Sequence, residues 1–303
     1  MVHIFIVNPF AGQKTFADDL RTKLSKIKGL NYFVFNTRCQ GYEQELVRKV
    51  QTTFENEKLR FYCCGGSGTM RNMLNGFDDL EKAEVAFFPC GLTNDFLKVF
   101  GKYQEKFYEI EELIDGDVIT VDYIKTNHGI ALNTFSVGWD STIVNKVEEY
   151  RILSIFGKQV PYACATLFAL FRARPQEYTL YLDDQKVEGK FAEVFWGNGN
   201  ILGGKLCFAE NAFVTDGQGE YTIGPNVAAF RALPILVALQ GRNYEKVRKA
   251  CKCGHCSKLR LRRKDGAPFT VNFDGELVTG VKEWEARIVK QGLHLVVPKG
   301  VKL

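Results

Sequence analysis

A glycine-rich segment, Gly65-Gly66-Ser67-Gly68-Thr69, follows the apolar run 59–64 and precedes a helical pattern. Glycines let the backbone approach an anion closely, and a helix N-terminus offers unpaired N–H groups and a positive dipole. Thr69 adds a hydroxyl donor. The segment therefore predicts phosphate binding, although the same glycines would also suit a tight packing corner.

Two short acidic segments could supply proton transfer or a metal site. Asp274-Gly275-Glu276 follows the strand-like segment 269–273, and its glycine turn is expected to bring two carboxylates together in an exposed bend. Asp216-Gly217 is a second acidic residue followed by glycine. Both segments are also ordinary Asp-Gly turns with solvated acids, so the residues alone leave the two interpretations open.

Asn94 and Asp95 stand at the start of a predicted helix over 94–101. Asn94 could cap that helix, since an amide oxygen can accept the first unpaired N–H groups. Asp95 could orient the phosphate loop or help to hold a catalytic metal. Either interpretation places the pair at the beginning of the helix.

A cysteine-rich segment contains Cys251, Cys253, His255 and Cys256. These four residues are too close together in the chain to wrap one tetrahedral zinc ion easily, so a metal would need a remote ligand. A redox role would require the motif at the start of a helix, whereas here it joins a helical pattern to a strand. Neither use is favoured.

Three further segments could meet a lipid. The apolar runs 162–171 and 230–239 could line a cleft for acyl chains, with ordinary core burial as the alternative. The alternating segment 258–264 carries several lysines and arginines, which would suit lipid headgroups or plain solvation.

The elements that must position these residues fall into two patterns. Over the first 125 residues, apolar strands alternate with amphipathic helices, which indicates an α/β fold with a parallel sheet. From about residue 128, short alternating segments separated by Gly and Asp turns indicate an antiparallel sandwich. Helical stretches interrupt it at 141–174 and 226–250, the second broken or kinked at Pro234. The predicted strands are 2–7, 31–35, 59–64, 84–88 and 118–124, and the predicted helices are 15–27, 42–56, 69–77 and 94–101.

Composition narrows the class of protein. The chain has 303 residues, is 46% hydrophobic and carries a net charge of +5, which does not demand nucleic acid yet is compatible with an anionic membrane surface. No apolar run approaches the length of a transmembrane helix or resembles a secretory signal. The nine cysteines form an odd count with adjacent pairs, which favours reduced thiols and a cytoplasmic protein with, at most, peripheral membrane contact. A homodimer is left open.

The segments taken together resemble the diacylglycerol kinase and sphingosine kinase family of lipid kinases, in its bacterial type. The glycine segment is similar to the family's Gly-Gly-Asp-Gly-Thr loop, which NAD kinases share. Segments 8–12 and 89–96 are similar to its Asn-Pro-x-Ser/Ala-Gly and Pro-x-Gly-Thr-x-Asn-Asp-Phe motifs, and matches at 131–140, 197–204, 216–217 and 274–276 extend the resemblance over essentially the whole chain.

The resemblance implies a fold and an activity. The fold is an α/β nucleotide-binding domain of the NAD kinase/diacylglycerol kinase type over 1–125 plus about 291–303, followed by an antiparallel β-sandwich lipid-binding domain over 126–290. The activity is ATP- and Mg²⁺-dependent transfer of the γ-phosphate to a diacylglycerol-like lipid hydroxyl at a membrane surface.

The resemblance also implies roles for particular residues. Glu276 would accept the proton of the attacking hydroxyl, with Asp274 beside it. The Asp216 carboxylate and the carbonyls of Phe213 and Gln218 would hold a structural Mg²⁺. The residues implied to contact ATP are Asn8, Thr37, Gly65, Gly66, Ser67, Gly68, Thr69, Met70, Arg71, Leu92, Asn94 and Asp95.

The chain departs from the family's pattern in the phosphate loops. Ser67 occupies the acidic position, Leu92 replaces a threonine, and Arg71-Asn72 stands where Asn-Glu is common. Serine is neutral near pH 7, so it can neither bring a carboxylate to a metal nor accept a proton as one would. The alternatives are therefore a catalytically impaired nucleotide- or lipid-binding protein of the same fold, and an NAD kinase-like enzyme, which fits the phosphate loop but not 94–95 or 274–276.

Overall fold

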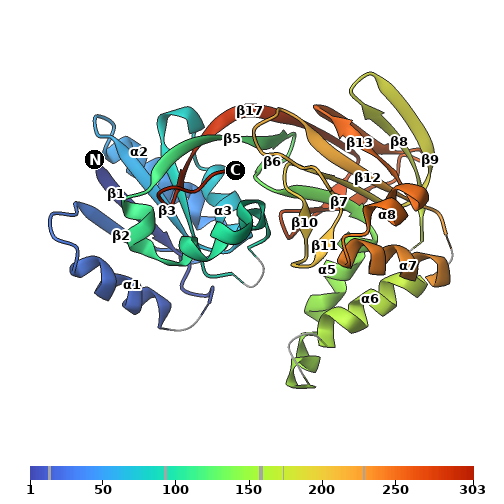
Figure 1. Ribbon diagram of the computed structural model, residues 1–303, viewed down its shortest axis with the longest axis horizontal. Coiled ribbons are helices and arrows are strands. Elements are labelled where there is room, and N and C mark those ends of the chain that lie inside the picture. Colours follow the sequence, from blue (N-terminus) through green and yellow to red (C-terminus); the bar gives the residue numbers. More distant parts are fainter. Residues whose placement is uncertain (13–14, 92–93, 157–159, 173, 228) are drawn as a thin grey trace. The chain divides into compact units, whose positions relative to one another are not determined.

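The chain forms two compact units, and the strands over residues 117–126 and 283–297 contribute residues to both (Figure 1). The computed structural model describes residues 1–303 except 13–14, 92–93, 157–159, 173 and 228. Unit 1 comprises Met1–Tyr123 with Val289–Leu303, and unit 2 comprises Ile124–Ile288.

Five parallel strands form the sheet of unit 1, in the order β17-β4-β3-β1-β2. Every residue of β1, β3 and β4 is buried, as expected for central strands of a parallel sheet covered on both faces. Because all five run the same way, their carboxyl ends meet along one edge. The strands are β1 Val2–Val7, β2 Tyr32–Asn36, β3 Leu59–Gly65, β4 Glu84–Pro89 and the last part of β17 Glu283–Val297.

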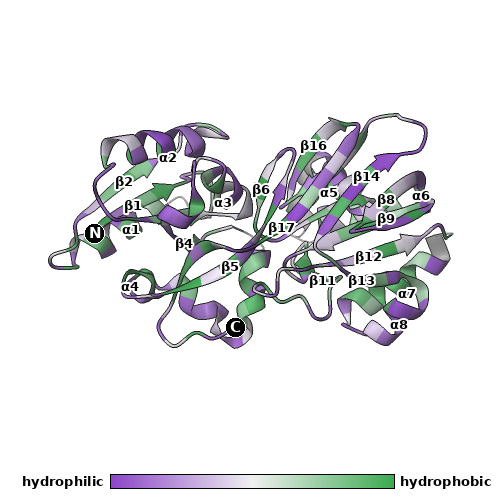
Figure 2. Ribbon diagram, turned by 90° about the horizontal axis from the view of Figure 1, so that it is seen from above, coloured by the Kyte–Doolittle hydropathy of each residue, from purple (hydrophilic) through white to green (hydrophobic). Residues whose placement is uncertain are grey.

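Helices follow the strands of unit 1 largely where their patterns predict them. The stripe of α2 buries Leu46, Val47 and Val50, while the rest of that helix is mostly hydrophilic (Figure 2). The predicted helix 94–101 is instead a longer 3-10 segment, η2, interrupted by non-helical backbone at Gly101. The helical elements are α1 Phe16–Ser25, α2 Tyr42–Thr53, α3 Ser67–Leu74, η1 Leu80–Lys82, η2 Asp95–Tyr108 and α4 Ile110–Ile114.

Antiparallel strands make up unit 2, which confirms the predicted change of architecture. The order is β16-β15-β7-β9-β8-β14-β17, with β12 joining β9 to β13 and β5 joining β17 to β6. The aromatic side chains of Phe135, Trp196, Phe273 and Trp284 are fully buried at its core. The strands are β6 Gly129–Ala131, β7 Thr134–Gly138, β8 Gln176–Leu182, β9 Gln185–Gly197, β12 Gly219–Pro225, β13 Lys252–Cys256, β14 Lys258–Arg263, β15 Phe269–Phe273 and β16 Glu276–Val281, with a small hairpin of β10 Ile201–Leu202 and β11 Leu206–Cys207; β5 Asp117–Thr126 lies mostly in unit 1 and ends in unit 2.

The two long helical stretches predicted for unit 2 are each divided. The first consists of α5 Trp139–Glu149, the 3-10 segment η3 Arg151–Phe156 and α6 Val160–Arg172. The second consists of α7 Ala229–Gln240 and α8 Tyr244–Ala250. The break expected at Pro234 falls instead after Gln240, where Arg242 has a φ of +55° and Asn243 caps α8 by accepting the N–H of Lys246.

The position of that break has a local reason. Pro234 is the sixth residue of α7 and removes one interior hydrogen bond without ending the helix, whereas a left-handed residue such as Arg242 ends a helix directly. None of the helices formed by the described residues is long and apolar enough to cross a bilayer.

Candidate active site

Backbone hydrogen bonds continue past the strand ends at the carboxyl edge of the unit 1 sheet. Thr37 N–H donates to Val7 O at 2.8 Å, Asn8 N–H to Cys64 O at 2.9 Å, and Cys90 N–H to Gly65 O at 3.0 Å. The loops that follow β1, β2, β3 and β4 are therefore tied to one another. This edge is where open α/β sheets place their ligands.

Two of these loops approach each other backbone to backbone, which only glycine permits. A Cβ on Gly91 would lie 2.7 Å from Gly66 Cα and 2.8 Å from Asn94 Oδ1, and a Cβ on Gly65 would lie 2.5 Å from Thr69 Cβ. These glycines do not have left-handed φ angles, so the space available, not the backbone conformation, excludes a side chain.

Asn8 links the first loop to the phosphate segment. Its Nδ2 donates to Thr69 Oγ1 at 3.0 Å, while its Oδ1 accepts the N–H of Phe10 at 3.0 Å. The Thr69 hydroxyl accepts this bond and keeps its own proton as a donor. The arrangement thus orients the Thr69 hydroxyl at the first turn of α3.

The first turn of α3 presents the remaining predicted phosphate contacts. Gly66 occupies the N-cap position, and Ser67 and Gly68 are partly exposed in the turn, whose leading N–H groups a helix leaves unpaired. Met70 is 2% exposed, so its side chain packs in the core, and its N–H donates to Gly66 O within the helix at 3.0 Å. Arg71 is partly buried one residue further along.

Asn94 does not cap a helix as one prediction had it. Its φ is +44°, and its side-chain Nδ2 donates back to Gly91 O at 3.0 Å and to Tyr108 Oη at 3.3 Å. Its Oδ1 is buried and has no hydrogen-bond partner among the described residues. Asp95 is buried and pairs with Lys98 Nζ at 2.7 Å, and Leu92 lies outside the described residues.

Two buried thiols, Cys63 and Cys64, lie near the end of strand β3, and a partly buried thiol, Cys90, follows β4. Burial raises the pKa of the Cys63 and Cys64 thiols well above the usual value and that of Cys90 to about 12. The three thiols therefore stay protonated near neutral pH and bring no negative charge toward an incoming phosphate.

Gly91→Ala tests the contact between the two glycine loops. The added methyl group cannot fit against Gly66 Cα, so the loops must separate. We expect the free energy of unfolding to fall by about 1–3 kcal/mol and ATP to bind at least about tenfold more weakly. Chemical denaturation and calorimetric titration measure the two effects. Gly241→Ala is the control, since its Cβ would come no closer than 3.2 Å to a neighbour; equal behaviour of the two variants would contradict the prediction.

In unit 2, Asp274 and Gly275 form the turn between β15 and β16, with φ angles of +49° and +88°. Positive φ at both positions is typical of a type I′ hairpin turn. Asp274 is 7% exposed, so the expectation of two carboxylates in an exposed bend is wrong for this residue. Glu276 follows at the start of β16 and is partly exposed.

The buried Asp274 carboxylate anchors the segment before β7. It accepts the N–H of Leu132 at 2.8 Å, of Thr134 at 2.7 Å and of Asn133 at 3.2 and 3.3 Å. Three backbone donors on one carboxylate leave little capacity for proton transfer. The geometry therefore gives Asp274 a positioning role beside Glu276.

A polar network that the sequence did not reveal supports the same hairpin. Asn272 Oδ1 accepts the N–H of Gly275 at 3.0 Å, and Asn272 Nδ2 donates to Asp140 Oδ2, which also accepts the Ser136 hydroxyl at 2.6 Å. Asp140 N–H donates in turn to Glu193 Oε2 at 3.0 Å. Only the polar residues at inward positions of β9 and β15 could have hinted at it.

The loop around Asp216 has the oxygen donors expected of a hard-cation site. Asp216 is exposed, its Oδ1 accepts the N–H of Gln218 at 2.8 Å, and its own N–H points to Phe213 O at 3.4 Å. One carboxylate with nearby carbonyls fits Mg²⁺ chemically. Among the described residues, no three His, Cys, Asp or Glu side chains are placed together so that they could hold a metal ion. An ion at Asp216 would therefore rely on carbonyls and water for most of its ligands.

The cysteine-rich segment forms part of β13. Cys251 and Cys256 are buried, and burial raises the pKa of both thiols to about 12. Cys253 Sγ lies 3.6 Å from Thr222 Oγ1. In the part of the chain that the structure describes, these residues assemble no metal site.

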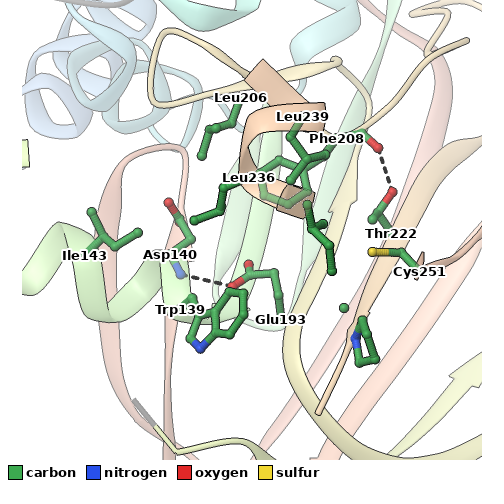
Figure 3. Close-up of a pocket in the computed structure, with 13 residues that line it drawn as sticks. Trp139, Asp140, Ile143, Glu193, Leu206, Phe208, Thr222, Leu236, Leu239 and Cys251 are labelled. Atoms are coloured by element: carbon green, nitrogen blue, oxygen red, sulfur yellow. Dashed lines mark hydrogen bonds between the residues drawn. The ribbon is translucent and has the colours of Figure 1, made fainter. Parts of the chain in front are cut away.

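An apolar pocket in unit 2 is the remaining candidate for substrate binding (Figure 3). The second predicted apolar run contributes to it, whereas Tyr162, Leu167 and Phe171 of the first run are exposed. Its apolar walls include Trp139, Leu206, Phe208, Ile235, Leu236 and Leu239.

Two family models together match most of the chain. Residues 3–126 match the diacylglycerol kinase catalytic domain, and residues 133–297 match the YegS C-terminal NAD kinase beta sandwich-like domain. The second match alone covers more than half of the chain.

Individual proteins give a similar picture. YtlR of Bacillus subtilis, provisionally named a lipid kinase, is 28% identical over 163 residues, 50% of this chain and 52% of its own. A Staphylococcus aureus protein provisionally named in the same way is 31% identical over 161 residues, 52% and 51% of the two chains. The chain thus matches about half the length of these curated relatives.

Solved structures share the fold over nearly the full length. A structure from Bacillus anthracis, provisionally described as a diacylglycerol kinase, superposes with a TM-score of 0.74 at 22% identity, covering 99% of this chain and 96% of that one. A second from the same organism has a TM-score of 0.70 at 21% identity, covering 99% and 98%. With both domain models matched in order along the chain, the protein belongs to the diacylglycerol kinase/YegS-like family of lipid kinases.

Proposed function

We propose that the protein is a kinase that transfers the γ-phosphate of ATP to a hydroxyl of a diacylglycerol-like lipid, with Mg²⁺. The observation that carries the proposal is the convergence of glycine loops at the carboxyl edge of the parallel sheet, where Gly66 and Gly91 meet without side chains. Phosphoryl transfer depends mainly on positioning and on stabilising charge, which backbone donors held in this way can provide.

In this proposal the unit 1 loops hold the nucleotide. The first turn of α3 and the Thr69 hydroxyl contact phosphate, Asn8 orients that hydroxyl, and Thr37 and Asn94 stand on neighbouring loops. Ser67 contributes a hydroxyl in place of a carboxylate. Phosphate binding depends on the N–H groups more than on position 67, so the substitution affects catalysis before binding.

Glu276 is the proposed acceptor of the lipid hydroxyl's proton, because it is the partly exposed acid of the hairpin whose other acid, Asp274, is committed to backbone donors. The Asp216 carboxylate with the Phe213 and Gln218 carbonyls would hold Mg²⁺. When bound, the ion would supply positive charge that holds these carboxylate and carbonyl oxygens together in the loop.

We further propose peripheral contact with a membrane, from which the lipid enters unit 2. The walls of the apolar pocket suit acyl chains. Exposed apolar side chains on η3 and α6 are of a kind that water does not favour and that an interface would cover. They are Ile152, Ile155, Tyr162, Leu167 and Phe171.

The deciding assay gives the full chain labelled ATP, Mg²⁺ and a panel of lipids in mixed micelles, beside the variant Ser67→Asp. Under the proposal, the wild type phosphorylates at least one lipid. No turnover by the wild type with turnover gained by Ser67→Asp would reject the kinase in favour of an impaired nucleotide- or lipid-binding protein. Phosphorylation of NAD in place of lipid would favour an NAD kinase-like enzyme.

A further inference from the structure

Glu193 is a buried acid that pairs with a glycine on each of its two neighbouring strands. It lies on β9, is 5% exposed, and stands opposite Gly138 on β7 and Gly224 on β12. A Cβ on Gly138 would lie 3.0 Å from Glu193 Cα, and a Cβ on Gly224 would lie 3.2 Å from Glu193 Cβ. The two glycines thus let the neighbouring strands pack closely against the Glu193 backbone and Cβ. The carboxyl group of Glu193 faces the apolar pocket of Figure 3.

One oxygen of the Glu193 carboxyl is held and the other is not. Oε2 accepts the N–H of Asp140 at 3.0 Å at the start of α5. Oε1 is buried and has no hydrogen-bond partner among the described residues. A buried polar atom without a partner costs free energy, which a ligand group of the right type can recover.

The charges around the pocket decide whether a ligand group that bonds Glu193 Oε1 must be a donor or an acceptor. Burial, and then the negative charge of Asp140, raise the pKa of Glu193 well above its usual value. The thirteen residues that line the pocket include no Lys, Arg or His to offset a second negative charge. The carboxyl is therefore neutral, and because Oε2 accepts a backbone N–H, its proton resides on Oε1.

The other polar groups of the lining point to the same ligand chemistry. The Thr222 hydroxyl donates to Phe208 O at 2.6 Å, so it is already engaged. The indole Nε1 of Trp139 is a second buried donor with no partner among the described residues. Asp140 is also in the lining, but its Oδ2 already accepts hydrogen bonds from Ser136 and Asn272. The donors left without a partner call for a ligand that brings an acceptor into an apolar space.

We infer that Glu193 selects the substrate by donating a hydrogen bond from Oε1 to the carbonyl oxygen of an acylated lipid. The inference rests on the proposed lipid substrate and narrows it to acyl esters or amides. Long-chain ethers lack the carbonyl, and long-chain amines such as sphingosine lack it too and bring a positive charge. Glu193 acts on binding and takes no part in phosphoryl transfer.

The test measures binding without ATP, by equilibrium dialysis below the concentration at which each lipid aggregates. The ligands are 1-monooleoylglycerol, its ether analogue 1-O-oleylglycerol, and sphingosine. We expect the wild type to bind the ester about tenfold more tightly than the ether, the effect of one hydrogen bond in an apolar site. Glu193→Gln keeps a donor and an acceptor and should retain the preference, whereas Glu193→Met should lose it.

Equal binding of ester and ether by the wild type, a preference that survives in Glu193→Met, or tighter binding of sphingosine than of the ester would each overturn the inference. Since no ATP is present, an absence of kinase activity leaves the result unaffected. Conversely, intact lipid phosphorylation with no preference for the ester would reject only the role of Glu193 and would leave the proposed kinase activity standing.

Discussion

Glu276→Gln is expected to lower lipid phosphorylation at least about a hundredfold while leaving the free energy of unfolding nearly unchanged. A positioned general base contributes about 10²–10⁴-fold to a rate, and glutamine has the same shape but cannot accept the proton. The side chain is partly exposed at the start of β16, so the change should be absorbed without strain. Steady-state turnover with labelled ATP and urea unfolding measure the two quantities.

The control for Glu276→Gln is Glu285→Gln, which removes an exposed acid on β17 of the same unit. It should leave both turnover and stability as in the wild type. A Glu276→Gln variant that kept its full rate would remove Glu276 from the proposed mechanism while the kinase activity itself stood. Equal loss of rate in both variants would point to a general effect of charge.

Asp274→Ala is expected to lower the free energy of unfolding by about 3 kcal/mol or more. The buried carboxylate accepts the N–H groups of three consecutive residues, Leu132 to Thr134, and its removal leaves those donors without their acceptor in a site closed to water. Each buried donor left unpaired costs about 1–3 kcal/mol. Urea denaturation followed by circular dichroism measures the loss.

The chain provides a closely matched control in Asp183. Its φ is also +49° at a hairpin turn, and its carboxylate also accepts backbone N–H groups, those of Ser257 at 3.0 Å and Lys258 at 2.8 Å, but it is exposed. Alanine suffers the same backbone strain at both positions, so the difference between the variants isolates burial. Asp183→Ala should cost about 1 kcal/mol, because water replaces the lost acceptor. Equal costs would show that Asp274 does not anchor the segment.

The arrangement of the candidate phosphate loops could be predicted from sequence because its parts are local. Each loop directly follows a continuous apolar strand, and parallel strands bring such loops to one edge without further information. The backbone approach of Gly66 to Gly91 was implicit in the residue types, although not its closeness. The prediction that failed is the helix cap at Asn94. This residue is left-handed and its side chain donates to Gly91 O, a conformation that the spacing of residues does not specify.

The hairpin of unit 2 was harder to predict because its interactions are distant in sequence. Asp274 is indistinguishable from a solvated turn acid until the segment at Leu132, some 140 residues earlier, is placed beside it. Glu193 likewise lies in an alternating strand whose inward positions are otherwise apolar, and only the pairing of β9 with β7 and β12 shows that glycines flank it. Long-range pairing, not local propensity, creates these sites.

The hydrogen bonds that continue past the strand ends of unit 1 bear on the entropy of ligand binding. Thr37, Asn8 and Cys90 each have their backbone N–H fixed by the neighbouring strand before any ligand arrives. Ordering one residue's backbone costs about 1–2 kcal/mol, and here that entropy is lost on folding. Nucleotide binding should therefore cost little conformational entropy in these loops. Most of the free energy of their contacts with the nucleotide then contributes to the affinity.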